Sequence, residues 1–204
     1  MFGDPVSNPM NWEVKRFNSF CKKITDGTHF SPPEVAVGVP YITAKNIKFD
    51  GIDLRKLTYV SEKHHQEIYK RCDPKTGDVL YIKDGATTGV AKVNNLRYEF
   101  SMLSSLALLR TDTLKMSPYF LENFLNFPSV FNSITAQMKG GAIKRLTIDK
   151  IKELESIVPP LQLQEKFAEI VQKFERVRRQ QREATRQAEH LFQTLLHRAF
   201  RGEL

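Results

Sequence analysis

The most regular pattern of hydrophobic and polar positions lies near the C-terminal end of the chain. Steps of three and four residues alternate there along one set of positions, which we call the seam. The seam consists of Leu163, Phe167, Ile170, Phe174, Val177, Gln181, Ala184, Ala188, Leu191, Leu195 and Ala199. A mean spacing near 3.5 residues keeps one stripe of a helix facing a partner helix. Such a helix is too long to be a surface helix packed on its own domain, so we expect an inter-helix coiled coil over residues 161–204.

One position of the seam is polar. Gln181 lies midway between Leu163 and Ala199, so it would meet its own copy in an antiparallel pair of identical helices. A parallel pair would bring the same two residues together, and Gln181 therefore does not decide the direction. A polar seam residue can fix the register of a coiled coil at a cost in stability. The alternative is a polar residue with no such role.

The pattern before the seam is of a different kind. Residues 1–160 contain all ten prolines and nine of the ten glycines, scattered among short apolar runs. These runs predict strands at 40–47, 78–82, 89–93 and 101–110. Helices are predicted at 61–71, 118–127, 130–138 and 148–154, with Ser61, Ser117 and Thr147 as N-caps and Pro118 at a first helical position. The strands do not alternate regularly with long helices, which disfavours a doubly wound sheet and predicts a mixed α/β domain of the α+β class.

The charge balance favours a polyanionic partner. The chain has 31 Lys and Arg residues against 23 Asp and Glu residues, a formal net charge of +8. The excess is shared, because both the first 160 residues and the last 44 are basic overall. A basic protein of this kind can bind the phosphate backbone of nucleic acid, although charge alone does not establish it.

Composition also excludes several classes of protein. With 41% hydrophobic residues and 14 phenylalanines, the chain is too apolar to be disordered. The mean hydropathy of −0.39 and the lack of an apolar run near 18 residues predict no membrane span. The first residues have no secretory signal pattern. Cys21 and Cys72 lack metal-site spacing, so we expect reduced, buried thiols in a cytoplasmic protein.

Residues 77–89 look at first sight like a phosphate-binding loop, with three glycines and a pair of threonines. The Gly-Lys-Ser/Thr ending of a P-loop is absent, however, and no Rossmann spacing is present. Two strands joined by a tight turn at Asp84 and Gly85 explain the pattern without a nucleotide. We interpret the segment as a hairpin that could present Lys83, Thr87 and Thr88 to DNA phosphate.

Residues 137–147 form the densest basic stretch outside the C-terminal helix. Lys139, Lys144 and Arg145 flank a pair of glycines that would allow close approach to another surface. This arrangement favours DNA contact. A solvated loop between helices is the alternative interpretation.

The segment from Thr25 to Phe30 predicts a polar turn. Short polar side chains such as Thr28 suit the reading of base edges, yet any loop contains such residues, and both interpretations stay open.

Sequence motifs give little support to catalysis. No zinc-protease motif, nucleophile elbow or paired-carboxylate arrangement is found. His64 and His65 point about 100° apart on a helix because they are adjacent, so they cannot form a helical metal site, and we expect both at the surface. A self-contained methyltransferase or nuclease is therefore disfavoured.

Taken together in order, the motifs resemble one half of the specificity subunit of type I restriction–modification systems, from end to end. Each motif is weak alone, and their order and spacing make the resemblance specific. They are Trp12, the Asp26-Gly27-Thr28 turn, Gly38-Val39-Pro40-Tyr41-Ile42 with Asn46-Ile47, Gly77-Asp78-Val79-Leu80 with Gly85 and Gly89, Gly140-Gly141-Ala142 with Leu146-Thr147, Ile157-Val158-Pro159-Pro160-Leu161, and the closing segment 195–204.

The resemblance implies a non-catalytic subunit with two parts after a connector-like segment at residues 1–11. Residues 12–160 would be a target recognition domain that reads half of a split site in double-stranded DNA. Residues 161–204 would be a spacer helix that pairs antiparallel with a second such helix. The chain itself would hold no cofactor. S-adenosylmethionine, ATP and Mg²⁺ would be used by the partner modification and restriction subunits, which methylate adenine and cleave DNA.

Family members of full length have two recognition domains and two helices, whereas this chain has one of each. Acting alone, it would form a homodimer through the helix and read a symmetric, interrupted DNA site. Alternatively, it is the back half of a longer subunit.

From the loops and the resemblance together we expect a set of DNA-contacting residues. They are Thr28, His29, Lys45, Asn46, Lys83, Thr87, Thr88, Lys139, Lys144 and Arg145. The alternative function is a coiled-coil interaction adaptor whose basic surface has no specific DNA target.

Overall fold

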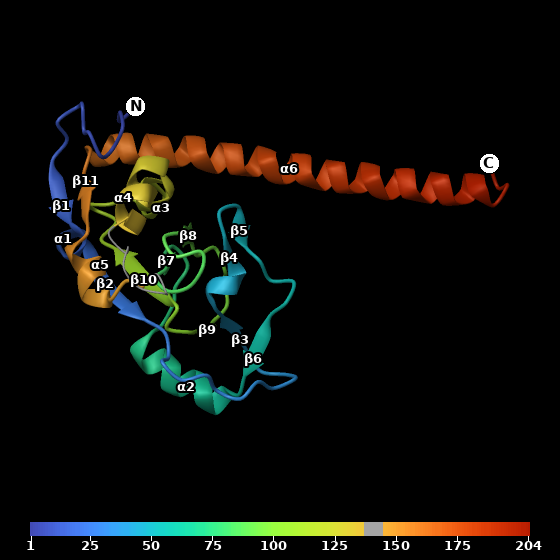
Figure 1. Cartoon of the computed structure of the whole chain (residues 1–204), viewed down its shortest axis with the longest axis horizontal. Helices are drawn as coiled ribbons and strands as arrows, with labels where there is room; N and C mark the ends of the chain where they lie inside the picture. The colour runs from blue at the N-terminus through green and yellow to red at the C-terminus, as the bar shows by residue number, and fades with distance from the viewer. Residues whose placement is uncertain (137–144) are drawn as a thin grey trace. The chain divides into compact units, whose positions relative to one another are not determined.

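The computed structural model describes residues 1–136 and 145–204. The chain divides into two units, Met1–Glu165 and Lys166–Leu204. Helices and strands are labelled in Figure 1. The mixed α/β class and the long C-terminal helix are confirmed.

The first unit is built around a four-stranded antiparallel sheet in the order β2-β10-β7-β8. Its strands are β2 (Cys21–Asp26), β7 (Val79–Ile82), β8 (Ala91–Val93) and β10 (Leu106–Thr111). Every side chain of β7 is buried, as expected for a short apolar run in the centre of a sheet that is covered on both faces. The predicted pairing of the strands at 78–82 and 89–93 is confirmed by β7 and β8, but the predicted tight turn at Asp84 and Gly85 is wrong, because residues 83–90 form a longer loop between them.

A second sheet has the order β6-β3-β9. In it β3 (Val39–Ile42) pairs antiparallel with β6 (Thr58–Val60) and parallel with β9 (Ser101–Met102). Two further pairs are short and antiparallel. They join β1 (Val14–Arg16) to β11 (Glu155–Ile157), and β4 (Ile47–Lys48) to β5 (Gly51–Ile52).

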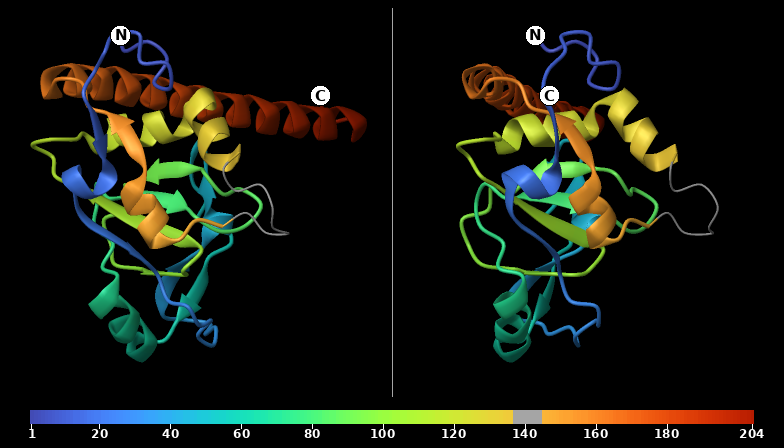
Figure 2. Two further views of the ribbon diagram at one scale, coloured as in Figure 1. Left: turned by 60° about the vertical axis from the view of Figure 1, so that its left-hand side comes forward. Right: turned by 90° about the vertical axis from the view of Figure 1, so that its left-hand side faces the viewer.

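Helices cover these sheets, as the two views of Figure 2 show. Among them, α3 packs on β7 and β8, while α2 packs on β9. The helices of this unit are α1 (Phe17–Phe20), α2 (Glu62–Arg71), α3 (Pro118–Asn126), α4 (Pro128–Ala136) and α5 (Ile148–Glu153), with a 3-10 turn at Ala44–Asn46.

Two of the three predicted N-caps are confirmed. The Ser61 hydroxyl accepts a hydrogen bond from the His64 N–H, and the Thr147 hydroxyl accepts one from the Lys150 N–H. Ser117 occupies the cap position of α3 but forms no side-chain cap. Its backbone N–H instead donates to Oε1 of Gln164, at 2.9 Å, in the first turn of the C-terminal helix.

Three predicted strands are clearly too long, and one of them, predicted at 89–93, begins only at Ala91. The strand predicted at 40–47 ends at Ile42, because Oδ1 of Asn46 accepts the Thr43 N–H at 3.0 Å and closes the 3-10 turn. The strand predicted at 101–110 is two strands, β9 and β10, because residues 103–105 turn to bond other loops. The helix predicted at 130–138 begins two residues earlier and is described up to Ala136. Residues 137 and 138 lie outside the described residues.

The long helix α6 (Leu161–Phe200) has 40 residues, which corresponds to about 60 Å. Within Lys166–Leu204 the seam is largely solvent-exposed in this single chain. Phe174 is 65% exposed, Val177 53% and Leu191 58%. In the described part of the chain, no helix combines the length and apolarity needed to cross a membrane.

Candidate nucleic-acid interface

The segment from Met102 to Ser105 is the point at which distant loops meet. The Thr28 N–H donates to the Met102 carbonyl at 2.8 Å, and the Ser104 N–H donates back to the Thr28 carbonyl at 2.8 Å. A side chain at Gly27 would overlap the Met102 carbonyl, so this close approach requires glycine. The loop that follows β2 is therefore fixed against the turn between β9 and β10.

Ser105 holds two further loops. Its hydroxyl accepts the Ala44 N–H at 3.2 Å, and its carbonyl accepts the Lys83 N–H at 3.0 Å. Lys83 in turn accepts the Leu146 N–H at 2.8 Å through its carbonyl. Four loops that are remote in the sequence are thus connected at one place in the first unit.

Four of the expected DNA-contacting residues are exposed on these loops. They are His29, Lys45, Thr87 and Arg145. The Arg145 guanidinium lies 3.5 Å from the Asp84 carboxylate and is 57% exposed. These side chains have room to meet a ligand.

Four other expected residues are buried and bonded within the chain. They are Thr28, Asn46, Lys83 and Thr88. The Asn46 amide donates to the Asp53 carbonyl at 3.0 Å, and the Thr88 hydroxyl donates to the Gly85 carbonyl at 2.7 Å. In this structure these side chains shape the loops rather than face solvent. Lys139 and Lys144 lie outside the described residues.

Sequence reasoning did not find the charged cluster that surrounds Asp26, the last residue of β2. One oxygen of its buried carboxylate accepts a hydrogen bond from Arg71, the last residue of α2. The other oxygen lies 3.3 Å from Nε2 of His29 and 3.4 Å from the Lys83 ammonium. We call these four residues the Asp26 cluster. No local sequence signal could have linked Arg71 to Asp26, because their contact depends on how the two sheets pack.

A second charged network lies nearby. Arg110 binds the Asp78 carboxylate through two contacts of 2.9 Å and also bonds Asp73, which accepts from Lys23 at 2.7 Å. The hydrogen bonds that Arg110 donates to the Asp78 carboxylate hold the pKa of Arg110 above its usual range. Burial opposes ionisation of Asp73, yet Lys23 and Arg110 together hold its pKa below the usual range. Two cations and two carboxylates therefore balance one another.

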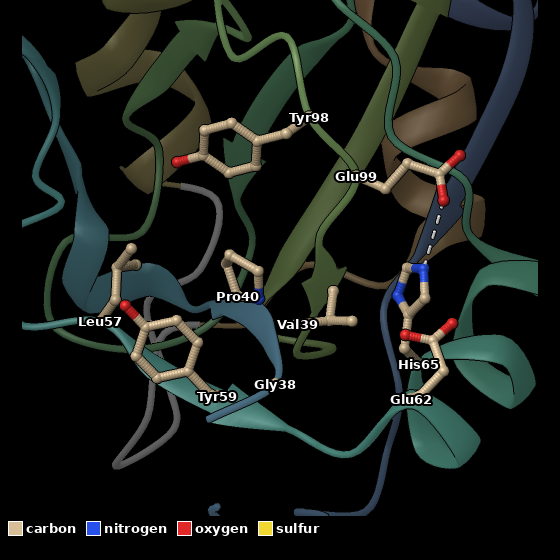
Figure 3. Close-up of a pocket in the computed structure, with 9 residues that line it drawn as sticks. All are labelled: Gly38, Val39, Pro40, Leu57, Tyr59, Glu62, His65, Tyr98 and Glu99. Atoms are coloured by element: carbon tan, nitrogen blue, oxygen red, sulfur yellow. Dashed lines mark hydrogen bonds and ion pairs between the residues drawn. The ribbon is translucent and has the colours of Figure 1, made fainter. Parts of the chain in front are cut away.

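An open pocket of about 480 Å³ lies at the start of β3 and is drawn in Figure 3. Its lining includes Tyr59, Tyr98 and two carboxylates, those of Glu62 and Glu99. Since carboxylates repel phosphate, this pocket is unsuited to the backbone of a nucleic acid.

His65 corrects one of the expectations from sequence. It is buried, 4% exposed, rather than at the surface. Its Nδ1 lies 3.0 Å from the Ser101 hydroxyl and its Nε2 lies 3.4 Å from Glu99, the contact dashed in Figure 3. The Ser101 hydroxyl is completely buried, so it is not open to a substrate as a nucleophile. The contacts of His65 with Ser101 and Glu99 instead connect α2 with β9.

Neither cysteine is paired. Cys72 is buried as expected, whereas Cys21 is partly exposed. Among the described residues, no group of His, Cys, Asp and Glu side chains could hold a metal ion.

Comparison with known proteins places this geometry in a family. Residues 9–188 match the family described as type I restriction modification DNA specificity domain. The MjaIX type I restriction enzyme specificity subunit of Methanocaldococcus jannaschii is 25% identical over 167 residues, which is 80% of this chain and 38% of that protein. The EcoKI specificity subunit of Escherichia coli is 25% identical over 200 residues, covering 92% of this chain and 42% of that protein.

A solved structure supports the fold. A chain from a study of complex assembly and conformational transition in the type I R-M system superposes with a TM-score of 0.59 at 23% identity, covering 96% of this chain and 47% of that one. This chain thus spans less than half the length of each of these relatives. Because the family match extends over most of its residues, the chain belongs to the type I restriction modification DNA specificity domain family.

Proposed function

We propose that the chain is a sequence-specific DNA-recognition subunit, or half of one, of a type I restriction–modification complex. The observation that carries the proposal is the convergence of loops on Met102–Ser105: three loops bond this segment directly, and a fourth, at Leu146, is joined to it through the Lys83 carbonyl. Loops that are fixed to one rigid segment can present side chains to a duplex with a defined spacing, which base reading requires.

The exposed residues divide by chemistry. Lys45 and Arg145 carry charges suited to phosphate, which supplies affinity without sequence information. Thr87 carries a hydroxyl suited to base edges in the major groove, whereas the imidazole of His29 suits either a base edge or a phosphate. Four buried side chains hold these loops in shape, namely those of Thr28, Asn46, Lys83 and Thr88. We also propose phosphate contacts for Lys139 and Lys144, from the sequence alone.

The roles of the parts of the chain are those expected for this family. Residues 12–160 act as the target recognition domain, preceded by a connector at 1–11, and residues 161–204 act as the spacer helix. The chain is non-catalytic and cytoplasmic. Adenine methylation and restriction are carried out by modification and restriction subunits, which use S-adenosylmethionine, ATP and Mg²⁺.

The exposed seam of α6 supports pairing with a second helix, because apolar side chains such as Phe174 and Leu191 lie open to water in the single chain. In a homodimer the two helices run antiparallel and the two recognition domains read a symmetric, interrupted site. The same exposed seam also favours the second candidate function, a coiled-coil adaptor without a DNA target.

Selection of duplexes from a randomised library by the full chain, followed by titration at several salt concentrations, tests the proposal. We expect one enriched sequence and an affinity that falls steeply with salt. The double variant Lys45→Ala with Arg145→Ala is expected to bind all duplexes more weakly and with a smaller salt dependence. Lys15→Ala, which removes a half-exposed cation from β1, is the control. An adaptor would enrich no sequence.

A further inference from the structure

We propose that the Asp26 cluster is a phosphate-binding site in which Arg71 and His29 contact a phosphodiester of the DNA backbone. The proposal rests on the proposed function for the identity of the ligand. It assigns a binding role to Arg71, a residue on none of the loops that the sequence singled out, and a positioning role to Asp26.

The first step in the argument is the charge balance. Asp26 supplies one negative charge, while Arg71 and Lys83 supply two positive charges. Among the described residues, no second carboxylate pairs with either cation. The neighbouring network of Lys23, Arg110 and two aspartates is balanced, so the excess is a property of the Asp26 cluster. An anion is the species that would complete it.

The second step is the burial of the charges. The side chains of Asp26 and Lys83 are 3% and 2% exposed, so these charges lie away from water and are screened weakly. The side chains of Arg71 and His29 are 54% and 51% exposed. The cluster therefore has a buried ion pair at its base and two hydrogen-bonding side chains at the surface, where an anion can reach them.

The third step is the geometry of the donors. Arg71 uses one terminal nitrogen, Nη2, for both of its contacts, with Asp26 and with Nε2 of His29 at 3.2 Å. A guanidinium has five N–H donors in one plane, so Nη1 and Nε of Arg71 can each donate to a phosphate oxygen. Within the described residues, the remaining nitrogens of Arg71 and Nδ1 of His29 have no hydrogen-bond partner. Asp26 thus fixes the orientation of the guanidinium and leaves its Nη1 and Nε donors available.

The fourth step is position. His29 lies on the loop that is fixed to Met102, and the backbone of Lys83 is bonded to Ser105. The Asp26 cluster therefore belongs to the same set of converging loops as Thr87, the proposed base-reading residue. A phosphate held there would set the register of the duplex on the loops, and it would do so for every DNA sequence.

Inorganic phosphate is the probe that tests the site without DNA. We expect phosphate, compared with chloride at equal ionic strength, to raise the thermal midpoint of the full chain. Arg71→Ala is expected to lose this shift. Arg16→Ala is the matched control, because Arg16 is also an ion-paired arginine, 59% exposed, but lies on β1. Equal shifts in all three proteins would overturn the proposal.

A second variant, Arg71→Lys, keeps the positive charge that pairs with Asp26. It therefore separates loss of the phosphate contact from loss of folding. Because the positive charge beside Asp26 is kept, this variant is expected to stay folded, and because an ammonium lacks the planar set of donors, its phosphate shift should be smaller than that of the wild type. If both Arg71→Lys and Arg71→Ala kept the full rise in thermal midpoint on adding phosphate, the proposed contact would be contradicted.

Duplex titrations link the site to DNA. Arg71→Ala is expected to weaken binding about tenfold, the effect of one charge-assisted contact, on every duplex alike. The slope of log affinity against log salt should fall by about one, with Arg16→Ala unchanged. A change in which sequence is preferred would overturn the phosphate role. If the wild-type chain bound no duplex, the proposed function would fail, and the phosphate titration would still decide the site.

Discussion

The Lys83 ammonium lies 3.4 Å from the Asp26 carboxylate, and both side chains are almost completely buried. The two residues end different strands, since Asp26 closes β2 and Lys83 directly follows β7. Their buried contact joins the loop that follows β2 to the loop that follows β7, and both loops belong to the proposed interface. A buried pair of this kind is costly to break, because removing one partner leaves the other charged and without a counter-ion.

Asp26→Asn should therefore destabilise the first unit by about 3 kcal/mol. The variant keeps the shape of the side chain but removes the charge that Lys83 and Arg71 share. Urea unfolding followed by the fluorescence of Trp12, the one tryptophan in the chain, measures the effect. The double variant Asp26→Asn with Lys83→Met should recover part of the loss, since it also removes the buried cation. If the double variant lost as much stability as the two single variants added together, the broken ion pair would not be the cause of the destabilisation.

Gly27→Ala tests the contact between the loop after β2 and Met102. An added methyl group would overlap the Met102 carbonyl, which belongs to the backbone and cannot turn aside. We expect a loss of about 2 kcal/mol in stability. Ser31→Ala, an exposed position in the same loop, is the control and should change stability little. If Gly27→Ala were as stable as this control, the loop would not be fixed in the way described.

Features that depend on neighbouring residues could be predicted from the sequence. The caps at Ser61 and Thr147 are local, because each hydroxyl bonds an N–H three residues away. The 3.5-residue spacing of the seam likewise belongs to one continuous helix, and α6 follows it without interruption.

Features that depend on the fold could not be predicted in this way. The strand expected to run past Ile42 gives way to a turn because Asn46 offers the backbone a side-chain partner. His65 was expected at the surface, but α2 packs it against Ser101. Arg71 and Asp26 are 45 residues apart in the sequence, and no spacing rule relates them.

The stability of the chain should fall at alkaline pH. Burial raises the pKa of the Cys72 thiol to about 12, from an ordinary value near 9. The unfolded chain therefore releases this proton first as the pH rises. The thiol's contribution is fully present below pH 9 and is lost between about pH 9 and 12, at up to about 1.4 kcal/mol per pH unit. Burial raises the pKa of Tyr41 to about 12 as well, which adds to the effect.

Urea midpoints measured by circular dichroism from neutral to alkaline pH check this expectation. Cys72→Ala leaves a cavity and is expected to lower the urea midpoint at every pH. It should also make the fall of the midpoint at alkaline pH shallower, because one titrating group is gone. A decline of equal steepness in both proteins would argue against a buried thiol.

Leu191→Asp tests whether the seam of α6 is a helix–helix interface. Leu191 is 58% exposed in the single chain, so a charge there costs the isolated helix little, whereas in a coiled coil the same charge would be buried in the seam. Light scattering at several concentrations should give a dimer near twice 23.5 kDa for the wild type and a monomer for Leu191→Asp.

Gln193→Asp is the matched control for this prediction, because it introduces the same charge two residues away, at a position outside the seam. It should leave the dimer intact. Dissociation by both substitutions would point to a general effect of charge on α6 rather than to the seam. A wild-type monomer at every concentration would mean that the seam pairs with the helix of another chain, and the DNA target would then be asymmetric, since the second half-site would be read by a different recognition domain.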